Sequence, residues 1–187
     1  AEEYGGPMFW AHYSYLGLDP TGLSDRLVKN YFDLNRSHAM IQYSYSVENP
    51  KQWRGYGPNY WGFTASYTRN QDGTVGYDAH NPKNDRGVIT PTAALSSFPY
   101  TPKESMNVLR FLYTQKPDFI GSAGPYDATS IHYDNWFTPR YLAIDQGTIA
   151  PMIENYRTGL LWKLFMNAPE IKNGLKKLDF KSTKYNF

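Results

Sequence analysis

The chain has 187 residues with 19 basic and 17 acidic side chains, and its formal net charge of +2 argues against nucleic acid as a partner. It contains no cysteine, which excludes disulfides and thiolate chemistry, and no apolar run long enough to cross a membrane. Its distinctive feature is an aromatic content of 17%, with 17 Tyr and 5 Trp. Such rings suit either an aromatic core or a cleft that stacks on the C–H faces of sugars.

The N-terminal part of the chain predicts two helices. Residues 7–17 are expected to form a short buried helix, with Pro7 in its first turn. Residues 25–47 repeat apolar and aromatic side chains at helical spacing, with Ser24 available as the N-cap. Asn49-Pro50 is expected to end this second helix, because the residue before a proline avoids helical geometry.

Residues 49–90 predict a long irregular segment, because they are rich in Gly, Asn, Asp and Pro. Tyr67-Thr68 and Val75–Tyr77 could pair within it as a short hairpin. Its aspartates do not have the spacing of a Ca²⁺-binding EF-hand loop, and we interpret them as turn formers. These aspartates are Asp72, Asp78 and Asp85. The four histidines also have no metal-ligand spacing, so we expect neither a metal site nor a cofactor.

The next part of the chain predicts two helices and a second loop. Thr90-Pro91 starts a short helix that reaches about residue 97. Thr101–Glu104 has the sequence of a capping box with proline at the first helical position, which predicts a helix that ends at Lys116-Pro117. Residues 117–139 are expected to form a second long loop.

Pro151 fixes the start of the following helix. A helix that began directly after Asp145 would hold this proline in its interior at a cost of about 3 kcal/mol, whereas Thr148 as the cap puts it in the first turn. We therefore expect a turn at 145–147, a helix over Ile149–Tyr156, a buried apolar segment over Leu160–Met166 and a last helix over 167–178. Many helices with little strand predict an all-α fold, either stacked helix pairs or part of an α/α barrel.

Carboxylates among aromatic side chains are the chemistry that this sequence offers, since motifs for a serine nucleophile, a phosphate loop or a zinc protease are absent. Glycoside hydrolysis usually needs two carboxyl groups. Asp127 lies in an aromatic loop, Asp145 precedes a helix whose N–H groups favour an ionised side chain, and Glu154 lies mid-helix. Each has a structural alternative: Asp127 as a loop carboxylate that fixes the backbone, Asp145 as a turn or capping residue, and Glu154 as the ion-pair partner of Arg157 or of another helix.

The candidates for sugar contacts carry the same ambiguity. Trp61 and Trp136 fall in polar loops, where an indole is either a sugar platform or a packing residue. His12 is either a sugar ligand or a core histidine with satisfied hydrogen bonds.

Several stretches resemble one known family, the glycoamylase-like group, which includes bacterial endo-β-1,2-glucanases and a domain of cyclic β-1,2-glucan synthases. The matches follow one another in order along nearly the whole chain. They are residues 5–7 (GGP), 12–20 (HYSYLGLDP), 61–66 (WGFTAS), 90–102 (TPTAALSSFPYTP), 126–128 (YDA), 141–147 (YLAIDQG) and 152–166 (MIENYRTGLLWKLFM). The chain departs from the family pattern at Gly124-Pro125, where Phe or Gly-Phe is frequent, and at Thr148, where Pro is frequent.

The resemblance implies an (α/α)6 barrel whose inner helices and loops shape a glucan cleft. It implies that residues 1–187 form about the C-terminal half of a single catalytic domain, so that the missing N-terminal half is a partner and supplies the proton donor. Asp127 and Asp145 match positions within family motifs, which implies active-site roles. The matched stretches also imply substrate contacts for Tyr13, Tyr126, Tyr141 and Gln146.

The leading functional hypothesis is a hydrolase of β-linked glucan, with β-1,2 linkages, endo cleavage and an inverting acid/base mechanism. The alternatives are a non-catalytic glycan-binding or glucan-processing domain, and a glucoamylase-type hydrolase of α-glucan. The expected partner is a glucan oligo- or polysaccharide, and the expected location is periplasmic or secreted. No signal-peptide pattern opens the sequence, so we expect a processed form or a piece of a longer protein.

Overall fold

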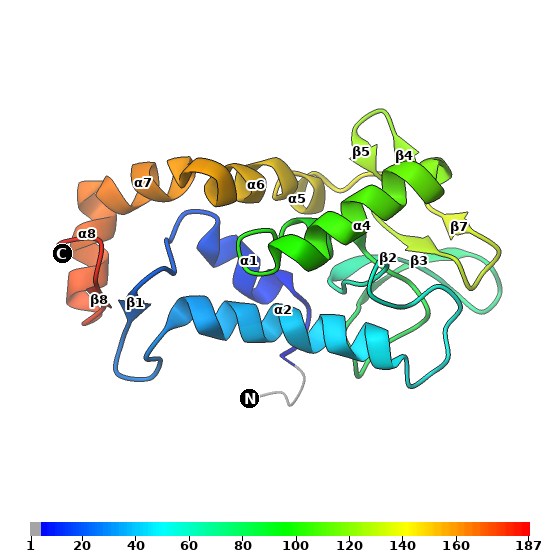
Figure 1. Cartoon of the computed structure of the whole chain (residues 1–187), viewed down its shortest axis with the longest axis horizontal. Helices are drawn as coiled ribbons and strands as arrows, with labels where there is room; N and C mark the ends of the chain where they lie inside the picture. Colours follow the sequence, from blue (N-terminus) through cyan, green and yellow to red (C-terminus); the bar gives the residue numbers. More distant parts are fainter. Residues whose placement is uncertain (1–4) are drawn as a thin grey trace.

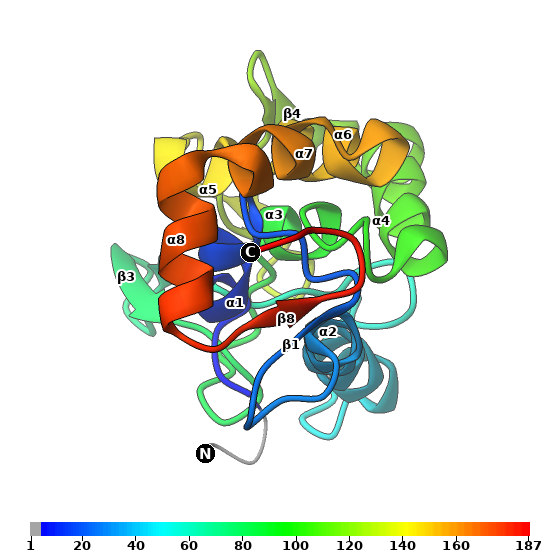
Figure 2. The same cartoon turned by 90° about the vertical axis from the view of Figure 1, so that its left-hand side faces the viewer.

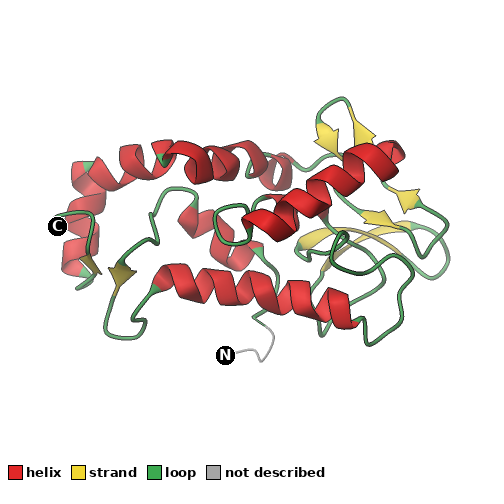
Figure 3. Ribbon diagram, viewed as in Figure 1, coloured by secondary structure: helices red, strands yellow, loops and turns green. Residues whose placement is uncertain are grey.

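Helices dominate the computed structural model, which describes residues 5–187 (Figure 3). Helix α2 runs along one side of the molecule, α6 and α7 run along the opposite side, and α1 and α4 lie between them (Figure 1). Helix α3 lies in the interior beside α1 (Figure 2). The helices are α1 (Phe9–Tyr15), α2 (Tyr31–Glu48), α3 (Pro91–Leu95), α4 (Pro102–Gln115), α5 (Ala143–Gln146), α6 (Ile149–Thr158), α7 (Leu160–Asn167) and α8 (Pro169–Lys177), with a 3₁₀ turn at Pro117–Phe119. No helix in this part of the chain is both long and apolar enough to cross a membrane.

Short antiparallel strand pairs connect these helices, so the fold is helix-rich rather than purely helical. Residues 5–187 contain four such pairs: β1 (Leu23–Ser24) with β8 (Lys181–Ser182), β2 (Ala65–Arg69) with β3 (Val75–Ala79), β4 (Ile120–Gly121) with β5 (Gly124–Pro125), and β6 (Thr129–Ser130) with β7 (Trp136–Phe137). The hairpin β2–β3 confirms the strands predicted around Tyr67 and Tyr77, and its register sets these two residues opposite each other.

Helix α2 begins at Tyr31, later than the predicted start at residue 25. Asn30 is its N-cap and accepts from the N–H groups of Phe32 and Asp33, so Ser24 has no capping role. The Asp25 carboxylate instead accepts from the N–H groups of Leu27 and Val28 and closes a turn before the helix. The predicted end is confirmed, because Asn49 adopts the left-handed conformation that terminates a helix.

The later helices start close to where the prolines predicted. Helix α6 begins at Ile149 with Pro151 in its first turn. Helix α4 begins at Pro102, although its capping box does not form: the Thr101 hydroxyl donates to the carbonyl of Ser97 rather than accepting from the first turn. The predicted turn at 145–147 is largely the short helix α5, which ends at Gln146.

The main core lies where α3 and α4 meet the loops after α2. Its buried members are Tyr60, Trp61, Phe63, Ile89, Ala94, Leu95, Phe98, Val108, Leu112 and Phe119. Burial of these large apolar side chains is the main source of stability here, since each contributes roughly 1.5–3 kcal/mol relative to exposure. The aromatic content therefore serves the core in part, as one interpretation of the composition expected.

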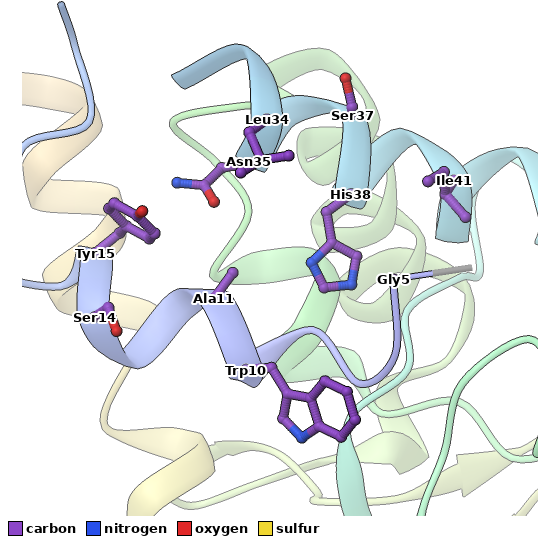
Figure 4. Close-up of a pocket in the computed structure, with 10 residues that line it drawn as sticks. All are labelled: Gly5, Trp10, Ala11, Ser14, Tyr15, Leu34, Asn35, Ser37, His38 and Ile41. Atoms are coloured by element: carbon purple, nitrogen blue, oxygen red, sulfur yellow. The ribbon is translucent and has the colours of Figure 1, made fainter. Parts of the chain in front are cut away.

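The outer face of α1 is exposed and apolar. A pocket of about 620 Å³ lies between α1 and α2 and is lined by Trp10, Leu34 and His38 among others (Figure 4). Further hollows lie between α1 and helices α7 and α8. The expectation that residues 160–166 are buried holds for Trp162 and Met166 only, since Leu164 and Phe165 are 66% and 40% exposed.

The C-terminal tail is tied to the segment between α1 and α2 at one edge of the molecule (Figure 2). Strand β8 pairs with β1, and the buried carboxylate of Asp19 accepts from the ammonium of Lys184 at 2.6 Å and the hydroxyl of Tyr185 at 3.0 Å. These bonds satisfy a carboxylate that would otherwise be costly to bury. The C-terminal tail thus stabilises the segment that joins α1 to α2.

Asp85 anchors the loops at the other end of the molecule. Its buried carboxylate accepts hydrogen bonds from the hydroxyls of Tyr45 and Tyr56, the indole N–H of Trp53 and the N–H of Gly87, all at 2.7–3.0 Å. Four donors converge on one carboxylate, so its charge is compensated without a cation. This residue was predicted to be a turn former, and it also joins α2 to the loops that follow it.

Replacing Asp85 with Asn is expected to lower the free energy of unfolding by about 1–3 kcal/mol, because the amide nitrogen cannot accept and leaves a buried donor unpaired. Chemical denaturation of the chain measures the change. The control is Asp118→Asn at an exposed position, which should stay within about 0.5 kcal/mol of the parent chain. Equal stability of the two variants would contradict the anchoring role.

Candidate active site

The structure brings Asp127 and Asp145 together from distant parts of the chain. Asp127 precedes β6, and its Oδ2 accepts from the backbone N–H of Tyr67 on β2 at 2.9 Å. Asp145 lies on α5, and its Oδ1 accepts from the hydroxyl of Tyr13 on α1 at 3.4 Å. Both residues are buried, with relative exposures of 3% and 2%. Two separate elements, β2 and α1, therefore donate hydrogen bonds to the pair.

Buried hydroxyl groups fix the backbone beneath Asp145. Its carbonyl accepts from the hydroxyls of Thr92 on α3 at 2.6 Å and Thr148 at 2.8 Å. Ser96 is in turn 2.5 Å from the Thr148 hydroxyl. This network ties the four-residue helix α5 to α3. Thr148 is the N-cap residue of α6 as predicted, but its hydroxyl is engaged in this network and makes no cap bond to the helix.

The two carboxyl groups interact directly and change each other's protonation. Burial, a hydrogen bond to Asp127 and the negative charge of Asp127 together raise the pKa of Asp145 to about 8. Burial also raises the pKa of Asp127, opposed by the hydrogen bonds from Tyr67 and Asp145. Asp127 Oδ1 and Asp145 Oδ2 are buried and have no hydrogen-bond partner among the described residues. The pair therefore shares a proton near neutral pH and titrates as a unit.

Three tyrosines surround the carboxyl pair. Tyr13 is 40% exposed, and the carboxyl groups together with burial raise the pKa of its hydroxyl. Tyr67 and Tyr77 come from the hairpin β2–β3, with ring centroids 6.3 Å apart at an angle of 87°. The guanidinium of Arg140 lies 5.3 Å from the Tyr67 ring centroid. The site is thus a carboxyl pair with aromatic faces and one cation beside it.

The other predicted aromatic residues near the pair form a second cluster. The ring of Tyr126 stacks on Phe137 with centroids 5.0 Å apart and lies 5.4 Å from that of Tyr141. Gln146 donates to the carbonyl of Ala123 in the turn between β4 and β5. Because Tyr126 and Gln146 directly adjoin Asp127 and Asp145 in sequence, this cluster borders the same site.

Several predicted site residues lie elsewhere. Trp61 has no exposed surface and packs in the core, so its indole offers no face to a sugar in this structure. His12 is 1% exposed and hydrogen-bonded to Ser97, and burial with the nearby His38 lowers its pKa to about 3. It is a core histidine here.

Glu154 and Trp136 also stand apart from the pair. The Glu154 carboxylate binds Arg157 at 3.3 Å and the hydroxyl of Thr158 at 2.6 Å on its own helix, the alternative that the sequence left open. Trp136 is half-buried on β7 and pairs in the ladder with Ser130.

Residues 5–187 contain no cluster of three or more His, Asp or Glu side chains arranged to hold a metal ion. The arrangement itself supports proton transfer: a buried carboxyl pair with a shared proton can act as a general base, and the neighbouring tyrosines can donate hydrogen bonds. This combination defines a class of helix-rich proteins with an acid/base site beside aromatic rings.

The chain belongs to the Glycoamylase family, whose model, described as "Putative glucoamylase", matches residues 1–169. It is 44% identical over 177 residues to an exo β-1,2-glucooligosaccharide sophorohydrolase (non-reducing end) from Parabacteroides distasonis, covering 93% of this chain and 24% of that protein.

Solved structures agree with this membership. An endo-β-1,2-glucanase from Chitinophaga pinensis, in a complex with sophorotriose and glucose, is 54% identical with a TM-score of 0.91, covering 99% of this chain and 43% of that one. A glucoamylase-family structure from Bacteroides uniformis is 49% identical with a TM-score of 0.91, covering 100% and 44%. The chain therefore spans less than half the length of these relatives.

Sequence reasoning did not select Tyr67, Tyr77 and Arg140 as site residues. The two tyrosines were recognised as strand residues, but only the register of the hairpin and the bond from Tyr67 to Asp127 bring them to the pair. A strand pattern does not indicate which loop the strand will contact. The sequence around Tyr67 and Tyr77 therefore gave no indication that they lie at the site.

The shared proton makes a prediction for stability. The folded chain keeps a proton on Asp145 up to about pH 8, whereas the ordinary pKa is 3.8, so unfolding releases this proton between those values. The contribution of Asp145 to the free energy of unfolding is therefore fully present below pH 4 and is lost as pH rises towards 8.

Asp145→Asn removes this ionisation, and its amide can still donate to Asp127. The variant should gain stability relative to the parent chain as pH rises from 4 to 8, by several degrees in melting temperature at pH 8. Thermal unfolding across this range measures it, with Asp118→Asn as the exposed control. A constant difference at all pH values would refute a shared proton.

Proposed function

We propose that this chain carries the general-base side of the active site of a glycoside hydrolase that cleaves β-linked glucan. The observation that carries the proposal is the buried Asp127–Asp145 pair with its neighbouring tyrosines. The relatives named as β-1,2-glucan hydrolases support β-1,2-glucan as the substrate. Because one relative is named an exo enzyme and another an endo enzyme, the endo mode is proposed from the resemblance and is open to direct test.

The pair is proposed to act as one catalytic unit rather than as acid and base on opposite sides of the sugar. In glycosidases the two carboxyl groups are separated by about 5–5.5 Å in retaining enzymes and by about 6.5–9.5 Å in inverting ones. Besides burial, the negative charge of Asp127 raises the pKa of Asp145, so the two carboxyl groups are close neighbours and are proposed to act together as one base. The monoanionic pair would therefore activate water, and a separate acid would protonate the leaving oxygen.

That acid is proposed to come from the missing N-terminal half of an (α/α)6 barrel, of which residues 1–187 form the C-terminal half. Support comes from the relatives' greater length and from the exposed apolar face of α1, where Trp10 is 66% exposed. With the acid across the sugar, inversion is the proposed stereochemical outcome. A periplasmic or secreted location is proposed for the complete protein.

Two alternatives remain distinguishable. A non-catalytic glycan-binding or glucan-processing domain would also present tyrosines to a sugar, and it would bind oligosaccharides without turnover. A glucoamylase-type enzyme would act on α-linked glucan, as the family description suggests. The buried carboxyl pair favours catalysis over binding alone, because holding two acids together in the interior is costly and contributes nothing to sugar stacking.

Asp127→Asn in the complete module is expected to lower kcat on linear β-1,2-glucan by about 10²–10⁴-fold, the usual contribution of a general base. The same preparation is assayed on laminarin, cellulose and starch. Asp118→Asn is the matched control and should retain parent activity, since it is an exposed aspartate on the 3₁₀ turn. Turnover of starch alone would overturn the proposed linkage.

Glu154→Gln belongs in the same series. If Glu154→Gln lowers kcat as much as Asp127→Asn does, Glu154 has a catalytic role. Retained activity would agree with its bonds to Arg157 and Thr158 on the same helix. Oligosaccharide binding without turnover by any preparation would favour the glycan-binding alternative.

The activity should also depend on pH through the pair. Below the raised pKa of Asp127 both groups are protonated and no base exists, so kcat rises with pH through that region. Near pH 8 the second proton leaves Asp145, and if the monoanion is the working form the rate falls again. Asp145→Asn should remove this alkaline limb. If the fall in rate near pH 8 persists in this variant, an ionisable group other than Asp145 causes it.

A further inference from the structure

The hairpin β2–β3 has one inward and one outward face. Ser66 and Thr68 point inward and are buried, whereas the alternate residues of both strands point outward. On the outward face Tyr77 is 59% exposed and its neighbour Val75 is 42% exposed. A large ring and a branched apolar side chain thus share one exposed surface of a short hairpin.

This surface adjoins the carboxyl pair. The N–H of Tyr67, on the free side of β2, donates to Asp127, and Tyr77 lies directly across the ladder from Tyr67. The ring of Tyr67 is covered on one side by Arg140 and meets Tyr77 edge to face. The Tyr77 hydroxyl has no hydrogen-bond partner among residues 5–187, so both its ring face and its polar edge are open.

The electrostatic environment of Tyr77 agrees with this placement. Its pKa is raised by partial burial and by the negative charges of Asp145 and Asp127. The placement itself follows from the ladder, since Tyr77 pairs with Tyr67, whose N–H is bonded to Asp127.

We propose that Tyr77 is the stacking platform for the glucosyl unit bound next to the Asp127–Asp145 pair. The ligand class is a neutral pyranose of a β-linked glucan, whose C–H face matches an open ring and whose hydroxyls match the free phenol. The inference rests on the proposed function and adds a specific sugar contact to it. Arg140 occupies the Tyr67 face, which leaves Tyr77 as the open ring of the hairpin.

The test uses Tyr77→Ala and Tyr77→Phe in the complete module. Loss of the ring should raise KM for β-1,2-linked gluco-oligosaccharides by roughly 10–100-fold and change kcat by less than about threefold, since the contact forms before the transition state. Tyr77→Phe keeps the ring and should stay within a fewfold of the parent KM. Tyr113→Ala is the matched control: Tyr113 is 54% exposed on α4, with no contact to the pair.

A second measurement separates this inference from the proposed function. Calorimetric titration of an oligosaccharide into Asp127→Asn, with and without Tyr77→Ala, reports binding without turnover. Adding Tyr77→Ala should raise Kd by the same factor by which it raises KM. Weaker binding in a protein that never turns over glucan would leave the platform standing and remove the catalytic proposal. Unchanged KM and Kd in folded Tyr77→Ala would overturn the platform. Lowered thermal stability with unchanged KM would show that Tyr77 packs against the rest of the module. That result would also overturn the proposal that Tyr77 is a stacking platform.

Discussion

Two acidic side chains held in contact inside a protein repel each other unless a proton lies between them. The fold keeps Asp127 and Asp145 in that position, both buried and each held from a different element. When both carboxyl groups are charged, their interaction is repulsive. The packing of the surrounding residues must therefore hold them near each other. The core around α3 and α4 and the hydroxyl network under α5 supply that constraint, and the rest of the site follows from it.

The hydrogen bonds distinguish the two oxygens of each carboxyl group. Asp127 has Oδ2 occupied by the N–H of Tyr67, and Asp145 has Oδ1 occupied by the hydroxyl of Tyr13. The opposite oxygen of each carboxyl is buried and has no hydrogen-bond partner among the described residues. A proton on one of these two oxygens would therefore relieve the repulsion within the pair. A pair built in this way retains one proton over a wide pH range, which keeps one base ready near neutrality.

Sequence reasoning predicted the two carboxyls but not how they are held. Asp127 stood out because it lies in an aromatic loop, Asp145 because it precedes a helix whose start Pro151 fixed, and both because they match family motifs. The predicted start of α2 was wrong because Asp25 forms a local turn and Asn30 is the better cap. Local hydrogen-bond competition of this kind is invisible to a periodicity pattern.

Side-chain contacts across the chain explain the remaining differences. Trp61 lies in a loop rich in polar residues, yet it is buried because the loop folds over α3 and α4. Leu164 and Phe165 lie on an apolar segment yet are exposed, because they line an open hollow between α7 and α1 that no described residue fills. In both cases the burial of a residue depends on which distant element reaches it, and that information is not present in its own neighbourhood.

Tyrosine rather than tryptophan surrounds the carboxyl pair, and the electrostatics supply a reason. A tyrosine hydroxyl can both donate to a carboxylate and accept from a sugar, whereas an indole N–H can only donate. Burial and the adjacent acids raise the pKa of Tyr13, so its proton stays in place throughout the range in which Asp145 titrates. Tyr13 therefore remains a donor whichever form the pair takes. A ring that keeps its proton and its open face beside a titrating acid is suited to holding a sugar while a proton moves next to it.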